Sequence, residues 1–223
     1  MEQRILTAGP YRLDCRLPAG AVRRVIYLHS PVENRTLPTD LLEQAGAALV
    51  CITGEDWNRD LTPWPAARVF PKGEDFGGGA AAYLRTLLDT VLPLAARSLP
   101  VGDAPRALAG VSLSGLFAVY AAHCTDAFDR ICSISGSLWY DGFLDFMART
   151  PVSPAVRRAY LSVGSREKNA GNPRVRQVED CTRRAAARLR QQGVDVRMEI
   201  NPGSHFADAD ARLRKGLAVL LEE

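Results

Sequence analysis

The chain has 223 residues, of which 47% are hydrophobic and 24% charged, with 28 basic and 25 acidic side chains. This composition is typical of a globular protein that buries a core without disulfide bonds. The net charge of only +3, with no long basic run, argues against nucleic-acid binding. We see no apolar signal segment and no membrane-spanning run. The five scattered cysteines favour a reduced protein, so we expect a cytoplasmic location.

Short apolar runs that are typical of strands recur along the chain. The first alternates in polarity and is predicted as an edge strand, whereas an almost wholly apolar run indicates a strand covered on both faces. In chain order the predicted strands are Tyr11–Leu17, Val22–Leu28, Ala47–Thr53, Arg106–Val111, Arg130–Ile134, Ala159–Val163 and Val194–Ile200.

Helical segments separate these runs. They are predicted at Leu41–Ala45, Gly79–Ser98, Leu113–His123, Pro173–Gln192 and Asp208–Glu222. Strands that alternate with helices predict an α/β protein with a mostly parallel central sheet flanked by helices, a three-layer sandwich. Because no linker or repeat interrupts the pattern, we expect one domain over residues 1–223 without a large lid. Cys and His do not cluster with metal-ligand spacing, so we expect no metal site and no cofactor.

A candidate nucleophile stands between a predicted strand and a predicted helix, in the sequence GVSLSG. A G-x-S triplet alone is weak evidence, because chance gives about one in a chain of this composition. Its context adds weight, since a sharp strand-to-helix turn lifts the Ser112 hydroxyl to the rim of the sheet. The alternative is an ordinary helix N-cap serine. Ser114 occupies the position of the second glycine of G-x-S-x-G, and we expect its small side chain to be tolerated there.

A serine nucleophile needs a base, and the chain contains only three histidines. His123 ends the helix that begins after Ser112, roughly 16 Å away at helical rise, which is too far. His29 ends a strand and is predicted to line the site. His205 follows the last strand, where the hydrolase order of nucleophile, acid and histidine places the base. A surface-loop histidine is the alternative for His205.

The acid and the oxyanion donors follow from the same order. Glu167 is the only carboxylate in the loop after Ala159–Val163, and it would hold the imidazole in one tautomer. The alternative role for Glu167 is a surface ion pair. Asp195 and Asp208 are weaker candidates for the acid. Leu113 would supply one oxyanion N–H. Since Pro31 has no N–H, Ser30 or Val32 must supply the second, and we favour Ser30.

Several segments together resemble the Putative esterase family of α/β-hydrolases, which includes esterase D and enterochelin-esterase-like enzymes. They are NRDLTP (58–63), GGG (77–79), GVSLSGLFAVY (110–120), SGSLWY (135–140), YLSVGSREK (160–168) and NPGSHF (201–206). The resemblance implies an α/β-hydrolase fold with Ser112, His205 and Glu167 as catalytic residues, although some members of the family use a Ser-His dyad. It also implies that Arg59 and Trp139 face the substrate. Ser114 in the elbow and the sequence HSP (29–31) in the oxyanion loop depart from the family pattern.

The sequence therefore predicts a serine esterase that acts on a small-molecule ester through an acyl-enzyme, without nucleic-acid or membrane partners. Two alternatives stay open. A hydrolase fold whose activity has decayed could serve as a binding or scaffold protein, and an acyltransferase would use the same residues. The substrate and the oligomeric state are not specified by the sequence.

Overall fold

A computed structural model of the chain describes residues 1–29 and 36–223. In this part of the chain, eight strands form one sheet in the order β1-β2-β4-β3-β7-β8-β9-β10. β2 is antiparallel to both of its neighbours, and the remaining pairs are parallel. The strands are β1 (Glu2–Ala8), β2 (Tyr11–Leu17), β3 (Arg24–His29), β4 (Ala47–Thr53), β7 (Arg106–Val111), β8 (Arg130–Ile134), β9 (Arg158–Gly164) and β10 (Asp195–Asn201).

The central strands agree with the sequence prediction to within two residues at their ends. The edge assignment is wrong, because β1, which was not predicted, pairs along the outer side of β2. The alternating pattern of Tyr11–Leu17 therefore belongs to an interior antiparallel strand whose two faces differ in burial.

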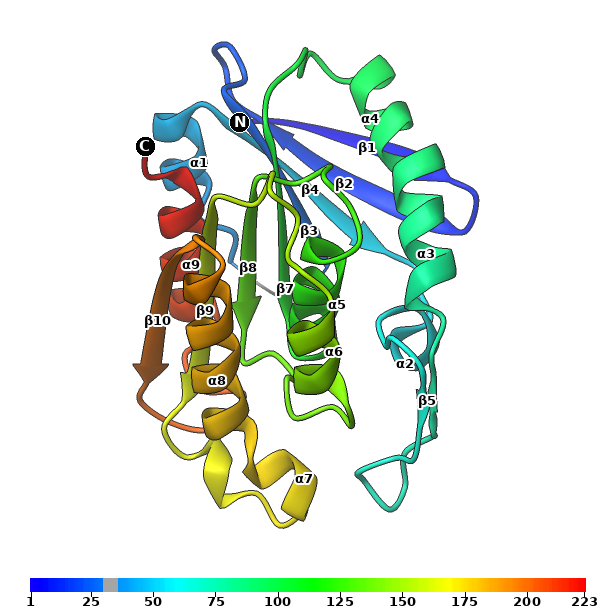
Figure 1. The fold of residues 1–223 in the computed structure, drawn as a ribbon. Coiled ribbons are helices and arrows are strands. Elements are labelled where there is room, and N and C mark those ends of the chain that lie inside the picture. Colours follow the sequence, from blue (N-terminus) through cyan, green and yellow to red (C-terminus); the bar gives the residue numbers. More distant parts are fainter. Residues whose placement is uncertain (30–35) are drawn as a thin grey trace.

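The helices that connect the strands lie on both faces of the sheet, which confirms the three-layer α/β prediction (Figure 1). Side chains of α1 and α9 pack with one core cluster, and those of α3, α4, α5 and α8 pack with the other. The helix bounds are α1 (Thr39–Ala45), α3 (Ala80–Thr86), α4 (Leu92–Ser98), α5 (Leu113–Ala122), α6 (Phe143–Arg149), α7 (Pro173–Arg176), α8 (Val178–Gln191) and α9 (Ala209–Leu221).

Two of the predicted helices are divided in the structure. Pro173–Gln192 becomes α7 and α8, and Gly79–Ser98 becomes α3 and α4 joined by a π-helical segment, Leu87–Val91. Pro93 accounts for the second division, because it has no N–H for the carbonyl of residue 89 and its ring would collide with that carbonyl in a regular α-helix.

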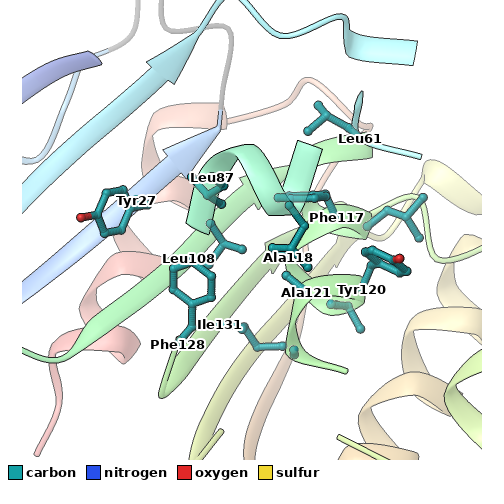
Figure 2. Close-up of a cluster of buried hydrophobic side chains, with 14 of the residues drawn as sticks. Tyr27, Leu61, Leu87, Leu108, Phe117, Ala118, Tyr120, Ala121, Phe128 and Ile131 are labelled. Atoms are coloured by element: carbon teal, nitrogen blue, oxygen red, sulfur yellow. The ribbon is translucent and has the colours of Figure 1, made fainter. Parts of the chain in front are cut away.

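The larger core cluster fixes the position of the segment that carries Ser112. Figure 2 shows side chains of α5, such as Phe117 and Ala121, packed with Leu108 of β7, Ile131 of β8 and Leu87. All ten residues of α5 are buried, so the helix is apolar on every side, as expected for a core element. Its first turn therefore has a fixed position relative to the carboxyl ends of the parallel strands.

Short elements gather at that end of the sheet. They are α2 (Trp57–Asp60) and a two-stranded hairpin of β5 (Pro65–Ala66) and β6 (Phe76–Gly77). In Figure 1, α2, β5 and α7 lie toward the end of the molecule to which the arrows of β8 and β10 point. Ligands of open α/β sheets bind at the carboxyl ends of the strands, and the predicted site residues follow those ends here.

Candidate active site

Ser112 occupies a strained turn between β7 and α5. Its φ of 62° and ψ of −122° lie in a region that side-chain-bearing residues rarely adopt and that is often found at functional sites. Three backbone hydrogen bonds hold it: the Ser112 N–H donates to Ile134 O at 3.0 Å, and Ser112 O accepts from the N–H groups of Ser137 at 3.0 Å and Leu116 at 3.1 Å. Gly110 makes room, because a Cβ there would lie 2.2 Å from the backbone of Ser114. The turn leaves the Ser112 side chain only half-buried.

Ser114 is fully buried and bonds the turn to the neighbouring strand. Its hydroxyl accepts from the Val111 N–H at 2.7 Å, and the hydroxyl oxygen lies 2.5 Å from His29 O and 2.8 Å from Val111 O, the two acceptors within reach of its single proton. The position in which the family pattern has a glycine therefore holds a side chain that cross-links β3, β7 and α5.

His205 and Glu167 form a hydrogen-bonded pair beyond the ends of β10 and β9. His205 Nδ1 lies 2.7 Å from Glu167 Oε2. An ionised carboxylate can only accept, so Nδ1 carries the proton and Nε2 is left as the basic nitrogen. The Glu167 side chain is 4% exposed and that of His205 is 30% exposed, so the acid is interior and the histidine reaches the surface.

The buried carboxylate of Glu167 is kept ionised by its partners. Burial alone would raise its pKa, but hydrogen bonds from His205 and Ser135, the charge of His205 and the Gly164 N–H bring it below its ordinary value. Ser135 Oγ and the Gly164 N–H each lie 2.6 Å from Oε1. Oε1 thus binds the sheet while Oε2 binds the histidine.

The other candidate bases and acids lie elsewhere. His123 is buried at the end of α5, with Nδ1 2.8 Å from Thr150 O. Asp195 begins β10, at the opposite end of that strand, and is paired with Arg158. Asp208 is the residue before α9 and lies in the left-handed region, with φ of 50°. Within residues 1–29 and 36–223, no hydrogen bond joins Ser112 Oγ to His205 or to any of these three side chains.

Of the two predicted oxyanion donors, Leu113 lies in the part of the chain that the structure describes and Ser30 does not. Leu113 is the first residue of α5, so its N–H is one of the helix donors without a partner inside the helix. Ser30 lies outside the described residues, as does Val32.

The prediction that His29 lines the substrate site is not supported, because its side chain is fully buried. Its Nε2 lies 2.6 Å from Tyr83 OH, and its ring packs edge-on against Tyr83 and Phe117. Burial lowers the pKa of His29 to about 3. His29 is therefore a neutral core residue, and we leave it out of the proposed substrate contacts.

Arg59 and Trp139 lie at the surface of the same end. The Arg59 side chain is more than half exposed, and its Nε donates to the buried carboxylate of Asp60 at 2.8 Å. Trp139 is half-buried, 6.3 Å from the ring of Phe76, with the Arg174 guanidinium carbon 5.7 Å from its ring centroid. Each of the two side chains is therefore held by a structural partner, and whether it also contacts substrate stays a prediction.

Sequence reasoning missed two residues that contact Glu167. Ser135 follows β8 with φ of 48°, and Arg212 lies in the first turn of α9 with its side chain 3% exposed. Ser135 stands in a segment that the resemblance had picked out, but nothing marked its hydroxyl. An arginine in an amphipathic helix is ordinarily exposed, so its burial could be seen only in the fold.

In the described part of the chain, no cluster of three metal-ligating side chains occurs. None of the helices described there is long and apolar enough to cross a membrane.

This architecture is that of the α/β-hydrolases, in which a strand-turn-helix carries the nucleophile and a histidine follows the last strand. The chain belongs to the Putative esterase family, which it matches over residues 18–209. It is 32% identical over 150 residues to the uncharacterized protein YbbA of Bacillus subtilis, which is 65% of this chain and 60% of that relative. It is also 37% identical over 82 residues to the iron(III) enterobactin esterase of Dickeya dadantii, a match that spans 34% of this chain and 19% of that enzyme.

Solved structures confirm the fold. An IroE-like serine hydrolase from Shewanella oneidensis superimposes with a TM-score of 0.80 at 17% identity, covering 99% of this chain and 79% of that one. The siderophore hydrolase EstA of Aspergillus nidulans gives 0.78 at 21% identity, with coverages of 99% and 93%. The enterobactin esterase FES of Shigella flexneri gives 0.72 at 19% identity, with coverages of 97% and 58%.

Proposed function

We propose that the protein is a serine esterase that cleaves carboxylic esters through an acyl-enzyme on Ser112. The observation that carries this proposal is the strained Ser112 turn at the same sheet end as the His205–Glu167 pair. Holding a serine in this conformation costs of order 1–3 kcal/mol, and such strain concentrates at functional sites. Membership of the Putative esterase family supports the same conclusion.

In the proposed mechanism, His205 Nε2 takes the proton of the Ser112 hydroxyl as the oxygen attacks the ester carbonyl. Glu167 holds the imidazole in the Nδ1–H tautomer and stabilises the imidazolium that forms. The Ser112–His205 hydrogen bond closes in the complex with substrate, as catalytic hydrogen bonds commonly do.

The negative charge that develops on the carbonyl oxygen is stabilised by the Leu113 N–H and by a second donor, for which we propose Ser30. The imidazolium then protonates the leaving alcohol. Water, activated in turn by His205, attacks the acyl-enzyme and releases the acid. The mechanism needs no cofactor.

We further propose that the substrate is a small-molecule ester. Two of the structural neighbours are described as siderophore hydrolase and enterobactin esterase, which makes siderophore esters one class to test, beside aryl and short acyl esters. Trp139 could stack on an aromatic group and Arg59 could attract an anionic one. The cytoplasmic location expected from the cysteines stays a prediction.

The proposal is tested by labelling with a fluorophosphonate probe, followed by hydrolysis of a p-nitrophenyl ester. The wild type should label and turn over, whereas Ser112→Ala should not label, and both Ser112→Ala and His205→Ala should lose activity by at least about 1,000-fold. Glu167→Ala should lose less than either. Retained activity in His205→Ala would contradict the mechanism, and full activity in Glu167→Ala would favour a Ser-His dyad.

The same experiment separates the two alternatives. A folded wild type that neither labels nor turns over would favour a decayed scaffold protein. Labelling with product transferred to an added alcohol in preference to water would favour an acyltransferase.

A further inference from the structure

Arg212 is a buried arginine on the side of Glu167 away from His205. It stands in the first turn of α9, where its N–H donates to Asp208 O at 2.9 Å. Its side chain is 3% exposed. A guanidinium stays charged in proteins, and burying it without a partner costs several kcal/mol. We therefore expect Arg212 to have specific ionic and hydrogen-bond partners.

The guanidinium contacts the proposed acid and the backbone of the loop that carries the proposed base. Nη1 lies 3.5 Å from Glu167 Oε1 and 3.3 Å from Ser135 Oγ, which itself donates to Oε1. Nη2 donates to Pro202 O at 2.8 Å. Pro202 begins the short loop that carries His205, so one rigid planar group joins the acid to the histidine loop.

The backbone around this group is shaped to admit it. Gly164 ends β9, and a Cβ there would lie 2.9 Å from Arg212 Nη2 and 2.8 Å from Glu167 Oε1. The loop of His205 is fixed further by the Arg166 N–H, which donates to Gly203 O at 3.0 Å. The same Cβ would lie 2.6 Å from Gly203 O, so the glycine at residue 164 admits the loop of His205, the carboxylate and the guanidinium together.

These contacts determine what Arg212 can do. It does not contact the reacting atoms, but its charge favours the ionised form of the neighbouring carboxylate. Its two nitrogens also fix the distance between Glu167 and the loop of His205. Misplacing a catalytic group by about 1 Å can cost roughly 100-fold in rate.

We propose that Arg212 is a positioning residue, which holds Glu167 ionised and aligned on His205 through its bridge between Glu167 Oε1 and Pro202 O. The proposal rests on the esterase function above. The charged and titratable groups bonded to Glu167 are His205 and Arg212, so loss of Arg212 leaves the buried carboxylate with the histidine as its one charged partner in the described chain.

The kinetic test compares Arg212→Gln, Arg212→Lys and Arg214→Gln with the wild type on a p-nitrophenyl ester. Arg212→Gln should lower kcat roughly 10- to 100-fold with little change in KM, and Arg212→Lys should recover part of the loss. Arg214→Gln is the matched control: it removes an exposed arginine–carboxylate pair, with Asp40, from the same helix, and should leave kcat unchanged.

A double variant distinguishes positioning from a general loss of structure. If Arg212 acts through Glu167, then Arg212→Gln combined with Glu167→Gln should be no slower than Glu167→Gln alone. Losses that multiply, or a wild-type kcat in Arg212→Gln, would overturn the proposal. Ser135→Ala, which removes the other side-chain donor to Oε1, should give a loss of the same kind without altering α9.

A measurement that needs no activity separates this proposal from the esterase function. The hydrogen-bonded Nδ1 proton of His205 should give a low-field NMR signal, assigned with His205→Ala. On acidification the signal should disappear at higher pH in Arg212→Gln than in the wild type, because Glu167 is protonated more easily. An unchanged signal would overturn the role of Arg212, whereas a shifted signal in a protein that fails to label would overturn only the esterase proposal.

Discussion

At the scale of single residues, His29 shows how burial decides what a histidine can do. It ends β3 beside the Ser112 turn, yet its ring lies between Tyr83 and Phe117 and its pKa falls to about 3. It is therefore neutral at any pH at which the protein would work. His205, which reaches the surface and binds a carboxylate, has the surroundings of a base.

Burial of His29 predicts a pH dependence of stability. In the unfolded chain its pKa is about 6.5, so the unfolded state takes up a proton below that pH and the folded state does not. The free energy of unfolding should then fall as the pH falls from 6.5 toward 3, by about 1.4 kcal/mol per pH unit from this one group.

The variant His29→Phe tests this dependence, because it keeps an aromatic ring between Tyr83 and Phe117 but cannot titrate. It should be less stable than the wild type at pH 7.5, since Tyr83 OH loses its partner. By pH 5 the difference should shrink by about 2 kcal/mol. Urea unfolding at several pH values measures both curves, and parallel curves would show that His29 is protonated in the folded protein.

The difference in burial between His29 and His205 also explains which site residues could be predicted from the sequence. Ser112, Glu167 and His205 follow strand ends in the hydrolase order, and chain order is a property of the sequence. Arg212 and the buried state of His29 depend on how distant segments pack. A charged residue in a helix and a histidine at a strand end look the same in the sequence whether they end up buried or exposed.

At the scale of elements, the turn at Ser112 is held in part by hydrogen bonds of the Ser114 hydroxyl, which a glycine at position 114 could not make. From the sequence we predicted only that Ser114 would be tolerated, because the G-x-S-x-G motif indicates that a small residue fits at this position and says nothing about hydrogen bonds. The structure adds that its hydroxyl joins the end of β3 to the start of α5. Strand bounds were predictable from apolar runs, and the division of a helix before Pro93 follows from the local chemistry of proline, whereas the pairing of β1 depended on tertiary contacts.

Ser114→Gly should accordingly destabilise the protein. The buried Val111 N–H would lose its side-chain acceptor, which costs about 1–3 kcal/mol, and a glycine in a helix adds roughly 1 kcal/mol. Ser114→Ala should show the first cost alone, and Ala118→Gly, one turn further along α5, reports on a glycine without loss of a hydroxyl. Thermal unfolding and the rate of fluorophosphonate labelling are the measurements; a Ser114→Gly protein as stable as the wild type would mean that the hydroxyl contributes nothing.

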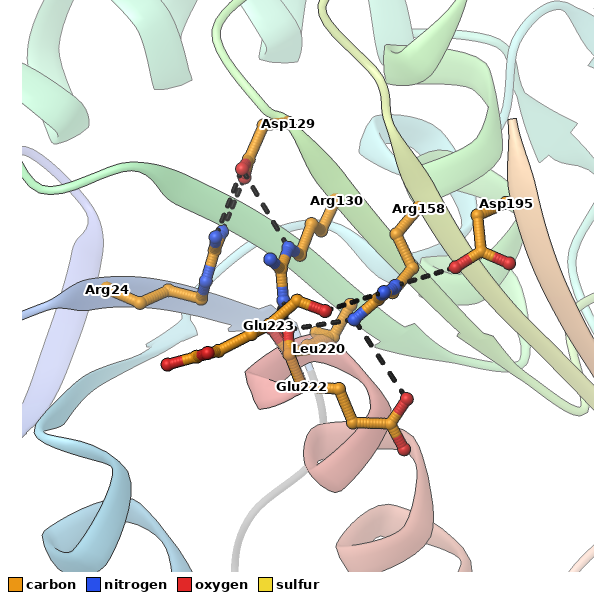
Figure 3. Close-up of polar contacts among 8 residues, drawn as sticks. All are labelled: Arg24, Asp129, Arg130, Arg158, Asp195, Leu220, Glu222 and Glu223. Atoms are coloured by element: carbon orange, nitrogen blue, oxygen red, sulfur yellow. Dashed lines mark hydrogen bonds and ion pairs between the residues drawn. The ribbon is translucent and has the colours of Figure 1, made fainter. Parts of the chain in front are cut away.

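At the scale of the whole molecule, the two ends of the sheet carry different tasks. The proposed chemistry lies at the carboxyl ends of the strands, whereas the amino ends of β3, β8, β9 and β10 carry an ion-pair network with the last residues of the chain (Figure 3). Arg24 pairs with Asp129, and Arg130 binds the carbonyl oxygens of Leu220 and Glu222. The network thus ties the end of α9 to the starts of four strands.

Arg158 lies at the centre of this network and should contribute stability without affecting activity. It donates to Asp195 at 2.9 Å and to the carbonyl oxygens of Glu222 and Glu223 at 2.8 and 3.0 Å, with its side chain 18% exposed. The Asp195 carboxylate is 68% exposed, so each of these bonds is screened by solvent; at about 0.5–1.5 kcal/mol per hydrogen bond, loss of all three in Arg158→Met should lower the free energy of unfolding by about 2 kcal/mol. Labelling of Ser112 should proceed at the wild-type rate, since the substitution lies at the far end of β9.

The matched control is Arg184→Met on α8, where the arginine and its partner Asp180 are both more than 60% exposed and 3.7 Å apart. Exposed pairs of this kind contribute little, so this variant should stay within about 0.5 kcal/mol of the wild type in urea unfolding. Equal effects of the two substitutions would show that the network adds no more than a surface ion pair. A slower labelling rate in Arg158→Met would show that the two ends of the sheet are coupled, because a change at the start of β9 would then reach Glu167 beyond its end.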